Sequence, residues 1–270
     1  MTMTKGKKEK VEIAIMGGTG VYDPGELTNT KQIKVYTPYG ATSELITIGD
    51  YAGKRVAFLP RHGRNHHVPP HNIPFRANIW ALNELGVKRI IAPCAVGSLR
   101  EELPPEYIVF PDQFYDNTKN RDYSFYDGGE VCHISVAEPF CNELRKFAIE
   151  SAKEMQISFQ EHGTSVCIEG PRFSTKPESI FYRDAIKAHV IGMTLVPECI
   201  LAREKQICYL PVAMVTDYDV WHEKPVSTEF VKQTMQKNIT TIRNLLINLL
   251  PKIPAQRTCD CESALDDAFI

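Results

Sequence analysis

The sequence has no long hydrophobic run, and this lack excludes a membrane-spanning helix. No stretch approaches the roughly 18 consecutive apolar residues that such a helix needs. The first apolar run, residues 11–16, is interrupted by Glu12 and is too short for the core of a secretory signal. We therefore expect an intracellular, cytoplasmic protein that binds no membrane.

The sequence also has no surplus of positive charge. Its 31 Lys and Arg are balanced by 33 Asp and Glu, which leaves a formal net charge of −2. A nucleic-acid-binding protein needs a clear basic surplus, so we expect no nucleic-acid partner. One basic run, KGKKEK at residues 5–10, precedes the first strand, and we expect residues 1–10 to form a flexible, solvated N-terminus.

Internal repeats and Pro/Gly/Ser-rich linkers are missing as well, and this argues against several domains. The chain has 270 residues, 43% apolar and 24% charged, a composition that suits one large soluble domain. We predict a single domain over residues 11–250. Residues 251–270 follow it as a C-terminal tail that contains a Cys-x-Cys pair, Cys259 and Cys261.

What the sequence does contain is an alternation of apolar strands and amphipathic helices. Strands are expected at residues 11–16, 44–48, 55–59, 87–94, 107–110, 164–168, 189–193 and 208–216. Helices are expected at residues 76–85, 138–155, 178–188, 197–205 and 227–250. Strands alternating with helices predict crossover connections and a largely parallel sheet, and hence an α/β fold.

Several local signals set the ends of these elements. Residues 50–53 predict a hairpin turn, and Gly86 predicts a helix stop. Pro139 suits the first position of a helix, and Ser227 suits an N-cap. The last helix is predicted to bury a stripe of apolar side chains on one face. That stripe consists of Val231, Met235, Ile239, Ile242, Leu246 and Leu249.

Unusual residues gather where the predicted strands end, which is the edge where α/β proteins bind ligands. Gly17-Gly18-Thr19-Gly20 follows the first strand, but it lacks the spacing of both dinucleotide and Walker-type loops. Backbone N–H groups and one hydroxyl suit a small anion, although the glycines alone also fit a tight turn. Arg61-His62 after another strand offers two further donors to an oxyanion, unless Arg61 is an ordinary surface residue.

Asp217 and Asp219 end the last predicted strand, on the same face two residues apart. Two carboxylates in a partly buried site raise each other's pKa, so one of them can hold a proton near neutral pH. The alternative is that they cap the start of a loop. Phe173 offers a ring for stacking and Ser174 lies beside it, so the group favours a pocket for a heterocycle.

A metal site is not predicted. His62, His66, His67 and His71 lie close in sequence, but Gly63, Pro69 and Pro70 prevent a regular helix there. No carboxylate lies in that segment, and the Cys-x-Cys pair of the tail lacks a second pair of ligands.

The motifs taken together resemble those of the methylthioadenosine phosphorylases, the adenine-selective branch of the trimeric purine nucleoside phosphorylase family. The matching stretches run in order from about residue 11 to 250: GGTG, RHGR, NIWAL, GSLREE, DQF, SFYDG, VAEPFC, EGPRFS, VPE and TDYD. The resemblance implies a single α/β domain with a central mixed sheet flanked by helices. It also implies a homotrimer or a dimer of trimers, no cofactor, and a nucleoside and inorganic phosphate as substrates.

The resemblance also implies site residues. For phosphate they are Thr19, Arg61, His62, Cys94, Ala95 and Thr194. For the nucleoside they are Phe173, Ser174, Asp217, Tyr218 and Asp219 around the base, Met193 under the ribose, and His133, Thr228 and Val231 around the 5′ group. Relatives commonly have Thr where this chain has Cys94, and many have an apolar residue in place of Thr228. Backbone contacts are therefore expected at Cys94.

The implied reaction is phosphorolysis of 5′-methylthioadenosine to adenine and 5-methylthioribose 1-phosphate. Phosphate attacks C1′, and Asp217 protonates N7 of the leaving adenine. Asp219 accepts from the exocyclic amine or orients its neighbour; the 6-oxopurine branch has Asn in place of Asp217. A broad-specificity purine nucleoside phosphorylase acting on adenosine and inosine is the alternative. A nucleosidase that uses water and a binding module without catalysis are further rivals.

The eight cysteines are more than an intracellular chain usually has. Resemblance to thermophilic archaeal members favours disulfides, because intracellular proteins of hyperthermophiles do form them. On that basis Cys141–Cys208 and Cys259–Cys261 are the candidate pairs.

Overall fold

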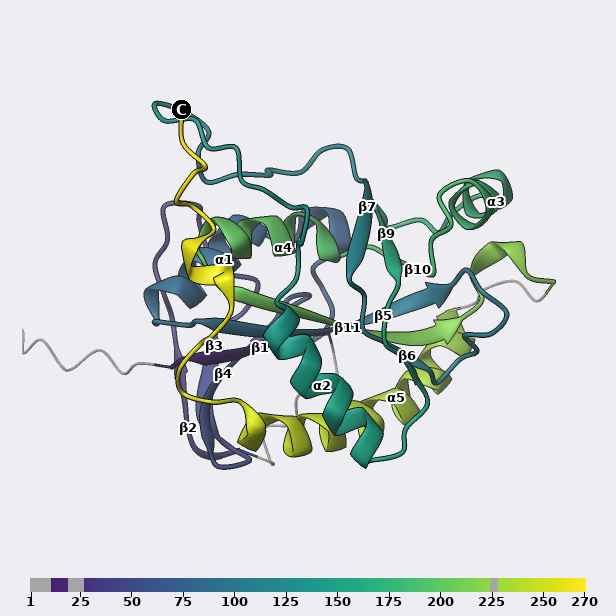
Figure 1. The fold of residues 1–270 in the computed structure, drawn as a ribbon, viewed down its shortest axis with the longest axis horizontal. Helices are drawn as coiled ribbons and strands as arrows, with labels where there is room; N and C mark the ends of the chain where they lie inside the picture. The colour runs from purple at the N-terminus through teal and green to yellow at the C-terminus, as the bar shows by residue number, and fades with distance from the viewer. Residues whose placement is uncertain (1–10, 19–26, 224–227) are drawn as a thin grey trace, which may run out of the picture.

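The strands of the molecule form one mixed sheet, seen nearly edge-on in Figure 1. In the computed structural model the described residues are 11–18, 27–223 and 228–270, so the predicted flexible N-terminus lies outside them. The strands are β1 (Ile13–Gly17), β2 (Thr28–Ile33), β3 (Ile46–Tyr51), β4 (Lys54–Pro60), β5 (Arg89–Ser98), β6 (Ile108–Val109), β7 (Gln113–Asn117), β8 (Phe159–Gln160), β9 (Thr164–Ile168), β10 (Val190–Gly192) and β11 (Cys208–Asp217).

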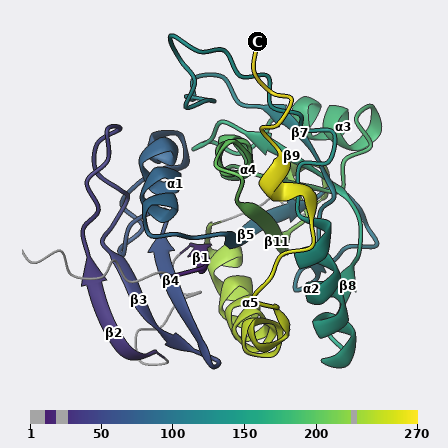
Figure 2. The same cartoon turned by 60° about the vertical axis from the view of Figure 1, so that its left-hand side comes forward.

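Five α-helices cover the described part of the sheet. They are α1 (Phe75–Glu84), α2 (Asn142–Glu154), α3 (Lys176–Asp184), α4 (Leu195–Glu204) and α5 (Thr228–Leu249). Figures 1 and 2 show α1 and α4 on one face of the sheet, α2 and α5 on the other, and α3 beyond the ends of β9 and β10. None of the helices in the described ranges is long and apolar enough to cross a bilayer.

Strand β5 is the centre of the sheet. It pairs in parallel with β1 and β11, while its last two residues pair antiparallel with β10. The main path runs β2-β3-β4-β1-β5-β10-β9-β7, and β11, β6 and β8 branch from β5. The mixed sheet implied by the family resemblance is thereby confirmed, and the carboxyl ends of β1, β4, β5 and β11 meet at one edge.

The core has two main layers because the inner strands bury both of their faces. In β1, Ile13 and Ile15 pack toward α2 and α5, whereas Ala14 and Met16 pack toward α1 and α4. Full burial on both faces explains why these strands read as continuous apolar runs in the sequence.

All eight predicted strands are present, with ends shifted by a few residues at most. The turn at residues 50–53 and the helix stop at Gly86, where φ is +87°, are also confirmed. Three further strands, β2, β7 and β8, were not predicted. The reason is plain for β2, which is a polar edge strand with five of its six residues exposed.

Three predicted helix starts differ from the structure by two residues or more. Helix α4 begins at Leu195, two residues before its predicted start. Helix α2 begins at Asn142, not at Pro139, because Cys141 is its N-cap and accepts a hydrogen bond from Leu144 N. Helix α3 begins at Lys176, where Thr175 and Glu178 form a reciprocal capping box. Ser227, the predicted N-cap of α5, lies outside the described residues.

The C-terminal tail packs against the body of the protein. Ile253, Cys261 and Ala268 of this tail are buried. The last residues run beside the long connection between β7 and α2, where Cys132 pairs with Phe269 in an antiparallel bridge (Figure 1).

Candidate active site

The acid pair lies where β11 ends against the carboxyl end of β5. A bulge at Thr216 shifts the register, so that Val215 lies opposite Val96 and Asp217 opposite Gly97. A Cβ atom on residue 97 would lie 3.0 Å from Asp217 Oδ1 and 3.2 Å from Asp219 Cβ. A glycine is therefore needed on β5 for both acids to pack this closely against the strand.

Hydrogen bonds fix both carboxylates. Asp217 Oδ2 accepts from the Thr216 hydroxyl at 2.7 Å, and Asp217 Oδ1 accepts from the Asp219 backbone N–H at 2.8 Å. Asp219 Oδ2 accepts from the hydroxyl of Ser179 in α3, at 2.6 Å. The carboxylate of Asp217 is thus bonded to the backbone of Asp219, and the carboxylate of Asp219 is in turn anchored to α3.

Burial changes the protonation of this pair. Asp217 is 7% exposed and Asp219 4%. Burial raises the pKa of Asp217, against the hydrogen bonds from Thr216 and Asp219. The pKa of Asp219 is raised to about 6, first by burial and further by the charge of Asp217, while the bond from Ser179 opposes the rise. Because the two groups interact, they titrate as a pair that can keep one proton close to neutral pH.

An aromatic ring and a buried hydroxyl lie on the loop before α3. Phe173 is 43% exposed, and the buried hydroxyl of Ser174 lies close enough to Asp219 to lower the pKa of that acid. Gly170, at φ +66°, lets this loop approach Met193, since a Cβ there would lie 2.7 Å from Met193 Sδ. The loop that carries the ring is thereby packed against the residue after β10.

Strand β5 has one exposed residue, although the strand lies in the centre of the sheet. Ala95 is exposed, while Ile90, Ile91 and Ala92 earlier in the strand are buried. The side chain of Cys94 faces β11, where its thiol donates to Val212 O at 3.9 Å, and burial raises the pKa of this thiol to about 12. The thiol is therefore neutral, and its hydrogen bond goes to β11.

Arg61 is buried at the same edge, in an ion pair that the sequence did not reveal. Its Nε and Nη2 donate to Glu198 of α4 at 2.9 and 2.7 Å, and Nη1 and Nη2 also donate to Pro93 O and Met16 O. Glu198 accepts a third bond, from the Tyr209 hydroxyl, at 2.7 Å. Four of the five guanidinium N–H donors are used in this way, which leaves one on Nη1.

His62, next to Arg61, is a neutral imidazole. Its Nδ1 donates to Val68 O at 2.9 Å, because a carbonyl oxygen can only accept. Burial lowers the pKa of His62 to about 4. The remaining ring nitrogen, Nε2, is then an acceptor at neutral pH.

Thr194 is the N-cap residue of α4, and its side chain makes no capping hydrogen bond. Thr194 directly follows Met193 in the sequence, two residues after β10 ends. Tyr218 was predicted to contact the base. In the structure its hydroxyl donates to Glu101 O at 3.3 Å, and its ring stacks on His222.

The structure describes the side chains of two of the three residues predicted around the 5′ group. Val231 lies half-buried near the start of α5, and the side chain of Thr228 is outside the described residues, as is Thr19 of the glycine loop. His133 is exposed on the connection between β7 and α2, where its backbone N–H donates to Ala268 O at 2.7 Å. The described contacts do not join His133 to the acid pair of its own chain.

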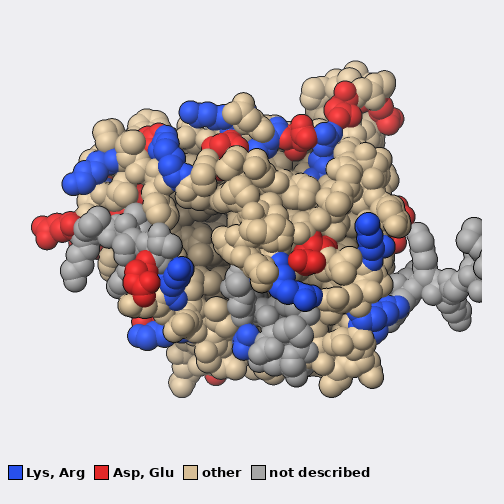
Figure 3. All heavy atoms as spheres, turned by 180° about the vertical axis from the view of Figure 1, so that it is seen from behind, with Lys and Arg blue, Asp and Glu red and all other residues tan. Residues whose placement is uncertain are grey.

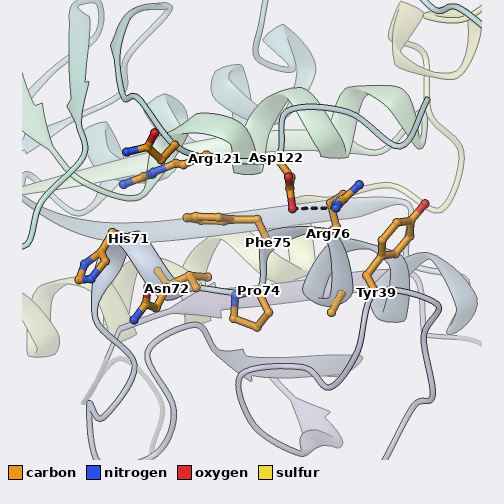
Figure 4. Close-up of a pocket in the computed structure, with 11 residues that line it drawn as sticks. Tyr39, His71, Asn72, Pro74, Phe75, Arg76, Arg121 and Asp122 are labelled. Carbon is orange, nitrogen blue, oxygen red and sulfur yellow. Dashed lines mark hydrogen bonds and ion pairs between the residues drawn. The ribbon is translucent and has the colours of Figure 1, made fainter. Parts of the chain in front are cut away.

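A pocket lies between the start of α1 and the β7–α2 connection (Figure 4). Its volume is about 210 Å³. Arg76 on its wall is already bound to Asp122 at 2.7 Å and to Asp127 at 2.5 Å, so its charge is neutralised. On the surface seen in Figure 3, charges of both signs are scattered around a central hollow.

Comparison with known proteins identifies the family. A family model described as the phosphorylase superfamily matches residues 12–251. The chain belongs to the phosphorylase superfamily. The S-methyl-5′-thioadenosine phosphorylase of Thermofilum pendens is 55% identical over 262 residues, which cover 97% of this chain and 100% of that protein. The protein of the same name from Saccharolobus solfataricus is 55% identical over 267 residues, 98% of this chain and 99% of that one.

Solved structures agree with this family. A methylthioadenosine phosphorylase from an Antarctic soil metagenomic library has a TM-score of 0.91 at 41% identity, over 97% of this chain and 93% of that one. The methylthioadenosine phosphorylase of Schistosoma mansoni in complex with adenine has a TM-score of 0.88 at 34% identity, over 95% of this chain and 96% of that one. The fold that holds Asp217 and Asp219 at the end of β11, and Arg61 after β4, is therefore the fold of a phosphorylase.

Proposed function

We propose that the protein catalyses phosphorolysis of 5′-methylthioadenosine to adenine and 5-methylthioribose 1-phosphate, in purine and methionine salvage in the cytoplasm. The observation that carries this proposal is the buried pair Asp217–Asp219, which can hold a proton near neutral pH. The names of the relatives from T. pendens and S. solfataricus support the choice of substrate. Inorganic phosphate is the second substrate, and no cofactor takes part.

In the proposed reaction a phosphate oxygen forms a bond to C1′ while the bond from C1′ to N9 of the purine breaks. The ribose passes through an oxocarbenium-like transition state, which the negative phosphate stabilises. Asp217 gives its proton to N7, so adenine leaves as a neutral molecule, and such general-acid catalysis is typically worth about 10²–10⁴-fold. Asp219 accepts from the exocyclic amine, which favours a 6-aminopurine.

We assign phosphate to the edge formed by Arg61, His62, Thr194 and the backbone at Cys94 and Ala95. The free Nη1 donor of Arg61 and the uncapped hydroxyl of Thr194 support this assignment. His62 Nε2 then accepts the proton of a hydrogen phosphate ion. Thr19 completes the anion site in this proposal.

We assign the nucleoside to the adjoining side of the acid pair. Phe173 stacks on the base, Ser174 supplies its buried hydroxyl, and Met193 lies under the ribose. Val231, Thr228 and His133 surround the 5′-methylthio group. Burying one methyl-sized group discriminates by only about 10–200-fold, so slower turnover of adenosine is expected.

We further propose that the protein is a homo-oligomer, a trimer or a dimer of trimers. Exposed apolar side chains support association: Val131 is 53% exposed, Phe181 49%, and Phe269 41%. Light scattering coupled to size-exclusion chromatography measures the number of chains directly. A monomer at micromolar concentration would contradict this part of the proposal.

The test of the reaction is adenine release from methylthioadenosine and from adenosine, each with and without phosphate. We expect release that depends on phosphate, is faster with methylthioadenosine, and falls at least 10²-fold in Asp217→Asn. Equal rates with both nucleosides would instead identify a broad purine nucleoside phosphorylase. Release without phosphate would overturn the proposed anion site and indicate a hydrolase.

A further inference from the structure

Four cysteines meet at one point, on the side of the molecule where the C-terminal tail packs. Cys141 is the N-cap of α2, Cys208 opens β11, and Cys259 and Cys261 lie at the 3-10 turn Asp260–Ser263. Their four sulfur atoms all lie within 4.8 Å of one another. The Cys-x-Cys pair seemed to lack partners in the sequence, but the fold supplies them from residues more than 50 positions away.

We propose that Cys141, Cys208, Cys259 and Cys261 bind one structural zinc ion. A tetrahedral zinc–thiolate centre has Zn–S distances of about 2.3 Å, which places its sulfur atoms about 3.8 Å apart. The observed cluster is close to this size, and Cys208 Sγ lies 3.4 Å from Cys259 Sγ.

Charge around the cluster suits bound thiolates. On binding a divalent ion the four thiols release four protons to solvent, so the centre carries two net negative charges. Leu144 N donates to Cys141 Sγ at 3.5 Å, at the positive N-terminal end of the 13-residue helix α2. Arg257 Nη1 donates to Cys208 Sγ at 3.9 Å. These donors from outside the metal shell favour the anionic form.

The arrangement fits a metal better than it fits two disulfides. Disulfides bring sulfur atoms together in separate pairs, and nothing in their geometry requires all four atoms to converge. A Cys259–Cys261 disulfide also closes a ring through only three residues. Cys208 Sγ and Cys259 Sγ, 3.4 Å apart, are in contact but not bonded, and they belong to different candidate pairs. Four thiolates leave no open coordination position, so zinc here binds the tail to α2 and β11 and takes no part in chemistry.

The test uses the full-length protein, expressed in a reducing cytoplasm and purified without chelators. We expect about one zinc ion per chain by mass spectrometry, and we expect cobalt exchanged for it to show the intense visible bands of a tetrahedral thiolate site. Cys141→Ser is the sharpest variant, because serine keeps the N-cap hydrogen bond and removes only the ligand. It should lose most of the zinc and the cobalt spectrum, and so should Cys259→Ser.

Cys132→Ser is the matched control, because Cys132 lies outside the cluster, and it should bind zinc as the wild type does. Both cluster variants should also become more sensitive to proteolysis after residue 250. A reduced, folded wild type that binds neither zinc nor cobalt would overturn the proposal. So would purified protein in which these four sulfur atoms resist alkylation until a reductant is added, the result expected of two disulfides. Neither outcome depends on the reaction proposed above.

Discussion

The hydroxyl of Ser179 donates a hydrogen bond of 2.6 Å to Asp219, and both side chains are buried. This bond joins α3 to the loop after β11 and opposes the rise in the pKa of Asp219 that burial causes. Ser179 is therefore a positioning residue: it holds the carboxylate and favours its ionised form without itself being assigned to the substrate.

Replacing Ser179 with Ala should raise the pKa of Asp219 above about 6. A hydrogen bond to a charged group is worth about 1.5–3 kcal/mol, which corresponds to a shift of roughly one to two pH units. The limb of the kcat/KM profile that reports this acid should move to higher pH by that amount. Ser151→Ala removes another buried hydroxyl, on α2, and should leave the profile unchanged. An unshifted limb in Ser179→Ala would refute the positioning role.

Asp219→Asn should make the protein more stable at neutral pH. The folded pKa of Asp219, about 6, is higher than its ordinary 3.8, so ionisation of this group costs stability as pH rises from about 4 to 6. Asparagine removes that cost and tolerates the left-handed backbone found here, at φ +51°. We expect a gain of about 2–3 kcal/mol in unfolding free energy at pH 8, and none below pH 4.

Urea unfolding of both proteins across this pH range is the measurement. Activity should fall in the same variant, as expected where an active-site charge is held at a cost in stability. A difference in stability that does not vary with pH would show that burial does not raise this pKa.

Gly97→Ala should lower kcat with little loss of stability. The added methyl group would lie 3.0 Å from Asp217 Oδ1 and must push the acids away from β5. A displacement approaching 1 Å can cost about 10²-fold in rate, so we expect a loss between tenfold and 10²-fold. Gly128→Ala is the control, since no atom lies within 4 Å of a Cβ there. Wild-type kcat in Gly97→Ala would show that the acids are not held against this strand.

Glu198→Gln should lower stability and strengthen phosphate binding. It leaves the buried charge of Arg61 without its partner, and breaking a buried ion pair costs about 3–5 kcal/mol. The guanidinium freed from Glu198 can then bind phosphate more strongly, so KM for phosphate should fall. Glu204→Gln changes another buried glutamate, one that binds Ser124 and the backbone of Phe125. It should leave KM for phosphate unchanged, and an unchanged KM in Glu198→Gln would argue against phosphate at Arg61.

The inner strands could be predicted because burial on both faces leaves a direct mark in the sequence. Strand β11, for example, is buried along its whole length. The polar edge strand β2 has no such mark, since its strand state comes from pairing with β3. In α5 the predicted apolar stripe is incomplete: Thr234 and Asn238 are buried there, and Asn238 donates to Val215 O beside the bulge.

The same distinction holds for the site. The acids and Arg61 could be proposed from the sequence because each follows a recognisable strand. The functions of Gly97, Ser179 and Glu198 depend on distances to residues 40 to 137 positions away, which no local pattern encodes. Glu198 offered one general clue, because a glutamate within an apolar stretch needs a partner.

The guanidinium of Arg61 donates to carbonyl groups at Met16 and Pro93, on two neighbouring strands, and starts from the end of a third. In the proposed anion site the same side chain thus has two roles, because it closes the end of the sheet and binds the attacking phosphate. In evolution, single substitutions on the loops after β9 and β11 could change which purine the enzyme prefers. Changing the nucleophile would require rebuilding the middle of the sheet, so preference for the leaving group is free to drift while dependence on phosphate is tied to folding itself.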